Sequence, residues 1–234
     1  MNLMRSPSRE PATRRPVSGP VSGERAVITG IVPAGRREDR YDIVVGGKRF
    51  AVLASEGVQR LGLHTGDDWS ELLAARVAEE AEALRVYDRA LAMLVSRGRA
   101  ARELRLILLK KREPEPLVNA AIDRLTRVGA LNDELFARQF VRERLARGSM
   151  APRRVQSELA RRGVSRATIE AALAEVREEE SIDDAAAIEK LAARKLRTMA
   201  KLEPPVRRRR LFAFLSRRGY DADDIRAAME KLAH

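Results

Sequence analysis

Apolar residues in the N-terminal part of the chain alternate with polar ones in short runs. Residues 40–45 and 48–53 are two such runs, and Gly46-Gly47 lies between them. Alternation is typical of half-buried strands, and a Gly-Gly pair provides the positive φ angles that a tight hairpin turn needs. Together with the β-rich segment 26–32, these runs predict a small three-stranded sheet. A sheet of this size is not stable alone, so we expect it to pack on another part of the chain.

Residues 55–61 predict a short helix, and from Asp67 onward the apolar residues recur at helical spacing to the end of the chain. This helical pattern repeats. In an ungapped superposition with offsets of 51 and then 56 residues, equivalent positions hold matching apolar residues, in the columns Leu104–Val155–Leu211, Leu108–Leu159–Leu215 and Val118–Ile169–Ile225. Apolar pairs at i and i+4 form one stripe on each helix. We therefore predict three tandem three-helix repeats of about 50 residues that stack on their neighbours.

A pair of alanines precedes the last position of this register in each repeat, at 120–121, 171–172 and 227–228. Because alanine side chains are small, we expect both members of each pair to allow neighbouring helices to approach closely.

Helix ends repeat in the same register. Gly163 and Gly219 are expected to end the middle helices of the second and third repeats, because glycine readily adopts the left-handed conformation found after a helix. Ser165 and Asp221 follow as N-cap residues of the next helix, and Asp224 completes a capping box.

The first repeat departs from this pattern, since Arg112 and Pro114 stand where the other two repeats have the glycine and the cap residue. Its turn must therefore be built differently. We expect Asn132-Asp133 to open the leading helix of the second repeat and Ser181 to open that of the third.

The expected fold is mainly α, with the three repeats forming an elongated curved stack after a small β-hairpin or three-strand N-terminal extension. The expected organisation is a disordered basic tail at 1–24, a β-rich subdomain at 25–66, a linking helix and first repeat at 67–130, a second repeat at 131–179 and a third at 180–234.

The composition indicates that the protein binds a charged partner. The formal net charge is +12 and the isoelectric point is about 10.8. Such a balance favours a polyanionic partner, although a genome rich in GC, which favours arginine codons, is an alternative explanation. The chain has no cysteine and only two histidines, His64 and His234, so we expect no metal site and no cofactor.

Catalysis finds no support in the sequence. The chain has no Gly-rich phosphate loop, no cysteine nucleophile and no usable histidine pair, so we expect a protein that is not an enzyme. No apolar run is long enough to span a bilayer, and the first 25 residues lack the apolar core of a signal peptide. We therefore expect a soluble cytoplasmic protein that does not engage membranes.

Cationic side chains recur at equivalent positions of the repeats and supply the candidate binding surface. The columns Lys110–Arg161–Arg217 and Lys111–Arg162–Arg218 are basic throughout, and Arg154 corresponds to Arg210. The expected binding residues are Lys110, Lys111, Arg153, Arg154, Arg161, Arg162, Arg207, Arg208, Arg209, Arg210, Arg217 and Arg218.

A structural role is the alternative for the cations at helix C-termini, where they stabilise the helix dipole by about 0.3–1 kcal/mol each. Arg162 and Arg218 also lie near the apolar stripe, where their stems can pack. Neither effect explains the run Arg207–Arg210, because four positive charges near the start of a helix are unfavourable. That local cost favours a partner-binding role.

Nucleic acid would meet such a surface through its phosphates. We expect any DNA binding to be weak, independent of sequence and strongly dependent on salt. The few aromatic residues offer little for base stacking, and we expect Phe136 and Phe140 to lie in the core.

Three segments of the sequence resemble the RecX family of regulatory proteins. They are residues 131–140, residues 147–164, which include the most recognisable stretch of the family, and residues 97–104, where Gly98 and Ala100 replace the usual Pro and Ser. The hairpin segment is similar to an N-terminal extension of some members, so the resemblance covers about residues 26–234.

The resemblance implies a regulator of the RecA recombinase. Family members bind the RecA filament on DNA, lodge in its groove and suppress its ATPase, strand-exchange and coprotease activities. Two other interpretations stay open. One is a sequence-independent DNA-binding protein or helix-turn-helix regulator that acts without RecA, and the other is a protein scaffold whose arginines are solvated. We expect a monomer in each case.

Overall fold

The computed structural model describes residues 26–35, 39–145, 150–181 and 183–232. The chain divides into two compact units, Met1–Val86 and Tyr87–His234. The tail expected at residues 1–24 lies outside the described residues. The mainly α fold with a small three-stranded antiparallel sheet near the N-terminus is confirmed.

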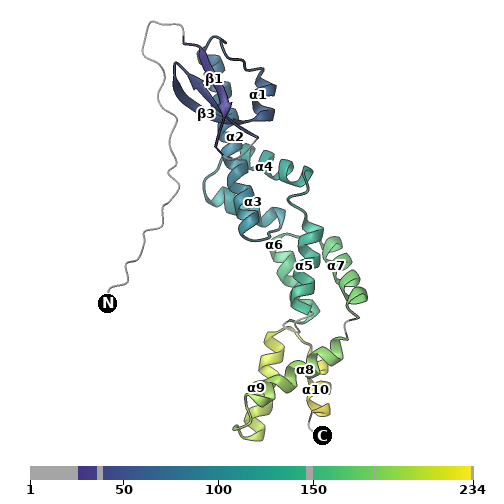
Figure 1. Cartoon of the computed structure of the whole chain (residues 1–234). Helices are drawn as coiled ribbons and strands as arrows, with labels where there is room; N and C mark the ends of the chain where they lie inside the picture. Colours follow the sequence, from purple (N-terminus) through teal and green to yellow (C-terminus); the bar gives the residue numbers. More distant parts are fainter. Residues whose placement is uncertain (1–25, 36–38, 146–149, 182, 233–234) are drawn as a thin grey trace, which may run out of the picture. The chain divides into compact units, whose positions relative to one another are not determined.

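The first unit contains the sheet, one short helix and the first part of a long helix (Figure 1). Its elements are β1 (Ile28–Pro33), β2 (Arg40–Val45), β3 (Lys48–Ala54), α1 (Ser55–Leu61) and α2 (Glu71–Ser96), which continues into the second unit. The sheet has the order β1-β2-β3 with antiparallel pairing, and Gly46 and Gly47 have positive φ angles in the hairpin turn. The predicted hairpin and the predicted helix at 55–61 are therefore confirmed.

The core of this unit forms where one face of the sheet meets α1 and the start of α2. Ile28, Ile43 and Leu53 of the sheet are fully buried, together with Val77 of α2. Trp69 joins this cluster, and its ring meets Phe50 edge to face at 4.8 Å between centroids.

The start of the helical part was predicted four residues too early. Asp68 forms a β-bridge with Val27, and α2 begins only at Glu71. The backbone of residues 66–69 is hydrogen-bonded to the edge of β1, since Ile28 N donates to Asp67 O at 2.9 Å. Ser70 then opens the helix by accepting a hydrogen bond from Leu73 N at 3.1 Å.

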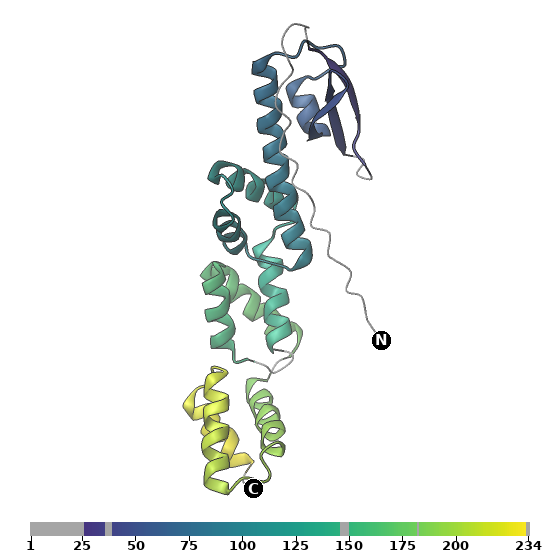
Figure 2. The same cartoon turned by 90° about the vertical axis from the view of Figure 1, so that its left-hand side faces the viewer.

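The second unit contains three groups of three helices (Figure 2). The first group is the end of α2 with α3 (Ala101–Lys110) and α4 (Glu115–Arg127), the second is α5 (Asp133–Leu145), α6 (Pro152–Arg162) and α7 (Arg166–Glu179), and the third is α8 (Asp184–Arg197), α9 (Pro204–Arg217) and α10 (Ala222–Lys231). The nine residues of the three predicted apolar columns are each at most 1% exposed. The repeat found in the sequence therefore corresponds to equivalent core positions.

Only half of the expectation for the alanine pairs is correct. The second alanine of each pair, Ala121, Ala172 and Ala228, is at most 3% exposed and lies in the core. The first alanine of each pair is exposed. Successive residues of a helix point about 100° apart, so a single residue of the pair faces the neighbouring helix.

Several predicted helix ends are confirmed. Gly163 and Gly219 have φ angles of 93° and 90°, and Ser165 Oγ accepts a hydrogen bond from Thr168 N at 3.1 Å. Asn132 Oδ1 accepts from two backbone amides at the start of α5, each at 2.9 Å. In the first repeat, Arg112 takes the positive φ angle, 62°, that glycine has in the other two.

One predicted N-cap is wrong, and a second is correct only in position. Asp183 caps α8 instead of Ser181, accepting hydrogen bonds from Ala185 N at 2.8 Å and Ala186 N at 3.2 Å. Ser181 has a positive φ angle of 47°, so the chain is still turning there. Asp221 does occupy the N-cap position of α10, but its side chain makes no capping hydrogen bond, and no capping box with Asp224 forms.

Consecutive repeats meet where the glycine after one middle helix approaches the first turn of the preceding middle helix. A Cβ atom added to Gly163 would overlap the side-chain carbons of Arg102 in α3. A Cβ added to Gly219 would lie 2.7 Å from the Cβ of Arg154 in α6. These two glycines are therefore required both for their backbone conformation and for space.

Hydrogen bonds from backbone amides also connect the repeats at the same two junctions. Ala101 N donates to the Asp133 carboxylate at 2.8 Å, so a side chain of the second repeat caps the middle helix of the first. Ala151 N, just before α6, donates to Arg218 O at 3.0 Å at the end of α9.

We predict that Gly163→Ala and Gly219→Ala destabilise the protein more than Gly129→Ala does. Gly129 also has a positive φ angle, 73°, but nothing lies within 4 Å of an added Cβ there. Gly129→Ala should cost about 1–2 kcal/mol from the backbone alone, and overlap at the junctions should add about 1–3 kcal/mol. Urea unfolding followed by circular dichroism measures the difference, and equal losses for the three variants would contradict the proposed packing.

Candidate binding surface

The twelve cations predicted as binding residues divide into two groups in the structure. Arg153, Arg154 and Arg162 make side-chain contacts across the junctions between repeats, and Arg218 accepts a hydrogen bond there through its backbone carbonyl while its side chain lies over the Phe214 ring; we call these four the junction arginines. The other eight make no ion pair within the part of the chain that the structure describes, and we call them the unpaired cations: Lys110, Lys111, Arg161, Arg207, Arg208, Arg209, Arg210 and Arg217.

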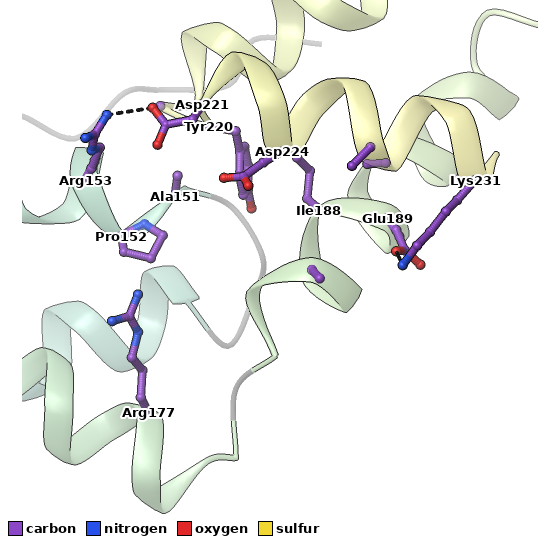
Figure 3. A pocket seen from close by; sticks show the side chains of 14 residues that line it. Ala151, Pro152, Arg153, Arg177, Ile188, Glu189, Tyr220, Asp221, Asp224 and Lys231 are labelled. Carbon is purple, nitrogen blue, oxygen red and sulfur yellow. Dashed lines mark hydrogen bonds and ion pairs between the residues drawn. The ribbon is translucent and has the colours of Figure 1, made fainter. Parts of the chain in front are cut away.

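The junction between the second and third repeats uses two neighbouring arginines at the start of α6. Arg153 Nη1 lies 2.6 Å from Asp221 Oδ1 (Figure 3), which explains why the Asp221 carboxylate does not cap its own helix. Arg154 Nη1 donates a hydrogen bond to Arg217 O, near the point where Gly219 packs on the Arg154 stem. Both side chains are therefore occupied in holding the third repeat to the second.

The junction between the first and second repeats uses Arg162 at the end of α6. Its Nη1 lies 2.9 Å from Glu103 Oε2 of α3, and both side chains are 21% exposed. The guanidinium carbon lies 5.2 Å from the centre of the Phe140 ring, close enough for a cation–π contact. Phe140 is 7% exposed and Phe136 packs against the same core, as expected for both.

A pocket of about 440 Å³ opens beside the junction of the second and third repeats (Figure 3). Its lining contains the three cations Arg153, Arg177 and Lys231 and the three carboxylates Glu189, Asp221 and Asp224. Glu189 accepts a hydrogen bond from Lys231 Nζ at 2.5 Å, which raises the pKa of that ammonium group. The three cations and the three carboxylates of the lining balance in charge, so this pocket does not present the excess positive charge of the chain.

A second hollow lies within the third repeat and differs sharply in charge. Its volume is about 710 Å³, and it is formed by the end of α8, residues 198–202 and one face of α9. Its lining includes five cations and no carboxylate, and we call it the basic groove; the cations are Lys195, Arg197, Lys201, Arg210 and Arg217. On α9, the lining positions 210, 213, 214 and 217 follow the i, i+3, i+4, i+7 spacing of a single helical face.

Only two residues of the basic groove, Arg210 and Arg217, are among those predicted from the sequence. Lys195, Arg197 and Lys201 come from α8 and the following turn, outside the columns of cations that recur on the middle helices. Local charge density would have found them. Residues 194–218 contain ten cations and one carboxylate, Glu203, which gives a net charge of +9 in a chain with a total of +12.

The remaining unpaired cations do not join the basic groove. Lys110 and Lys111 lie at the end of α3, and Arg161 lies in α6, each in another repeat. Arg207, Arg208 and Arg209 lie in the first half of α9 but do not line the groove. The structure therefore gathers only a subset of the predicted residues into one site.

These features define a class of protein, a helical-repeat protein that presents unpaired positive charge. Comparison with family models gives the particular family. The model described as RecX, second three-helix domain, matches residues 132–173, and the model described as RecX, third three-helix domain, matches residues 182–229.

Curated relatives agree with the family models. The regulatory protein RecX of Mycolicibacterium vanbaalenii is 35% identical over 137 residues, covering 56% of this chain and 73% of that protein. That of Pelodictyon phaeoclathratiforme is 31% identical over 143 residues, covering 61% of this chain and 86% of that protein. That of Halalkalibacterium halodurans is 33% identical over 162 residues, and the match spans 61% of its length. The chain belongs to the RecX family of regulatory proteins.

Solved structures show the same fold. A crystal structure of regulatory protein RecX superposes with a TM-score of 0.68 at 22% identity, covering 88% of this chain and 99% of that chain. RecX from Lactobacillus salivarius superposes with a TM-score of 0.52 at 18% identity, covering 65% of this chain and 97% of that chain. Among the described helices, none is both long and apolar enough to cross a membrane.

The two groups of cations predict different effects at adjacent positions of α6. Arg162→Ala removes an ion pair, a ring contact and a packed stem, so we expect it to destabilise the protein by about 1–3 kcal/mol. Arg161→Ala removes an exposed side chain without an ion pair in the described structure and should change stability by less than about 0.5 kcal/mol. Thermal or urea unfolding of the two variants tests this, and equal effects would show that Arg162 does not secure the junction.

Proposed function

We propose that the protein binds the filament of the RecA recombinase and modulates its activity, mainly by inhibiting the ATPase, strand-exchange and coprotease activities. Membership of a family of regulatory proteins supports a regulatory role. The observation that carries the proposal is the concentration of unpaired positive charge in the third repeat, which suits the polyanionic DNA of such a filament.

The junction arginines and the unpaired cations have different roles in this proposal. Arg153, Arg154 and Arg162 position the repeats, and the unpaired cations contact the filament. Most contacts come from the third repeat, residues 180–234. A protein bound along the filament would block its extension or the exchange of its subunits, so inhibition would need no chemistry by the protein itself. A RecA partner also implies a cytoplasmic location.

A protein that binds DNA without RecA is the second candidate function, and the basic groove is the observation that favours it. The two candidates differ in what they require. Regulation through the filament needs RecA and should act at low ratios of protein to RecA, whereas competition for DNA needs enough protein to cover the strand.

The first experiment is a titration of the protein into the single-stranded-DNA-dependent ATPase reaction of the cognate RecA. We expect inhibition at well below one molecule per RecA subunit, because a bound molecule stops events along many subunits. Inhibition only at ratios that cover the DNA would favour the second candidate, and absence of inhibition at excess would contradict the proposed function.

Reversal of two charges identifies the surface. We expect Arg210→Glu with Arg217→Glu to abolish inhibition of the ATPase while circular dichroism and thermal unfolding stay unchanged, because both side chains are exposed. Arg127→Glu with Lys190→Glu is the matched control, since it makes the same charge change at two exposed cations outside the groove. Unchanged inhibition by the first variant would contradict the assignment of the surface.

A further inference from the structure

We propose that the basic groove is a binding site for the sugar-phosphate backbone of a single nucleic acid strand, and that it binds this strand in the absence of RecA. The proposal deepens the proposed function and rests on it for its biological setting, but the binding itself is measured without the recombinase. In this proposal, the DNA of a filament is contacted by α8, α9 and residues 198–202, which line the groove.

The first argument is that the cations of the groove lack the partners that arginines have elsewhere in the chain. Between α5 and α7, for example, Arg142 Nε lies 2.9 Å from Glu180 Oε1. Arg197, Lys201, Arg210 and Arg217 make no such ion pair with described residues, and no carboxylate lines the groove. Like charges held together without compensation repel one another, and a bound polyanion removes this repulsion.

The second argument concerns geometry. The cations come from two helices that line one hollow, with Lys195 and Arg197 from α8, and Arg210 and Arg217 from α9. Arg210 and Arg217 are seven residues apart on one helical face, about 10.5 Å along the axis. Side chains in this arrangement can contact successive groups of one extended anion. Guanidinium groups suit phosphate because two of their N–H donors can bind two of its oxygens.

The third argument indicates that the groove contacts the backbone and not the bases. Phe214 is the aromatic residue of the lining, and two cations lie close to its ring. Lys195 Nζ lies 5.2 Å and the Arg218 guanidinium carbon 4.6 Å from the centre of its ring. The ring is also partly buried against the core of the third repeat. It therefore offers little free surface for base stacking, so binding should not depend on sequence.

A carboxylate-rich peptide is the other anion that five cations could attract. Peptide sites usually add pockets for apolar side chains, which supply part of the affinity. The large apolar side chains of the lining are already packed in the core of the repeat: Met199 is 6% exposed, and Leu202 and Phe214 are partly buried against the same core. The lining thus favours a partner recognised by regularly spaced charge, which a phosphodiester strand provides.

The test is a titration of the full-length protein into a fluorescein-labelled 30-nucleotide dT strand, followed by fluorescence anisotropy at several salt concentrations. The groove variant carries Arg197→Gln, Lys201→Gln, Arg210→Gln and Arg217→Gln. The control variant carries Arg76→Gln, Arg97→Gln, Arg127→Gln and Lys190→Gln, which removes the same charges from exposed positions outside the groove. Circular dichroism and thermal unfolding check that both variants fold.

We expect the groove variant to bind the strand at least about tenfold more weakly, and the slope of log K against log salt to fall by about 3, because each phosphate contact on a single strand contributes about 0.7. The control variant should keep the slope of the unaltered protein. An unchanged slope in the groove variant, or an equal loss in the control, would overturn the proposal.

Competition separates the two classes of anion. Unlabelled poly(dA) should displace the labelled strand, and polyglutamate at the same concentration of charge should displace it poorly. Equal displacement by polyglutamate would overturn the choice of nucleic acid. Loss of DNA binding in a groove variant that still inhibits RecA would support the groove and contradict its use in the proposed function.

Discussion

The close approach of one glycine to the first turn of another helix is the contact on which the arrangement of the repeats depends. Gly163 lies against Arg102 and Gly219 against Arg154, so the same type of junction occurs twice along the chain. The second and third repeats each have their own apolar core, and that of the second also takes in Ala100 from the first. The junctions therefore rely on a close backbone contact supplemented by ion pairs and, at the first junction, by the buried Ala100. The second and third repeats themselves are stabilised by burial of apolar side chains.

Arginine serves two purposes in this protein, and its surroundings decide which. Arg162 is half-buried between Glu103 and Phe140, so its charge is neutralised and its stem is packed. Arg217 is the equivalent of Arg161 in the third repeat and directly precedes the equivalent of Arg162, Arg218. Its side chain lines a groove that contains no carboxylate. The many arginines of the chain thus serve both the junctions between the repeats and the exposed cationic surface. A count of charges cannot tell which arginine has which role.

The sequence predicted the features that depend on local spacing. The apolar stripe of Val155 and Leu159, the Gly46-Gly47 hairpin and the positive φ angle at Gly163 follow from periodicity and backbone sterics. The pairing of Asp221 with Arg153 did not follow, because it needs two repeats to be placed side by side. Lys195 and Lys201 were missed for the same reason, since they join Arg210 only when α8 folds against α9.

The basic groove is built entirely by α8, α9 and the turn between them. Its lining residue Arg217 takes part in a junction through its backbone carbonyl, which a different side chain at this position would keep. The side chains of the groove and the junctions between the repeats can therefore change independently during evolution. Substitutions in the groove can tune attraction to an anion without disturbing how the repeats connect, and duplication of such a repeat would add a complete binding element. In a protein built in this way, the number of repeats and the affinity of the binding groove can change separately.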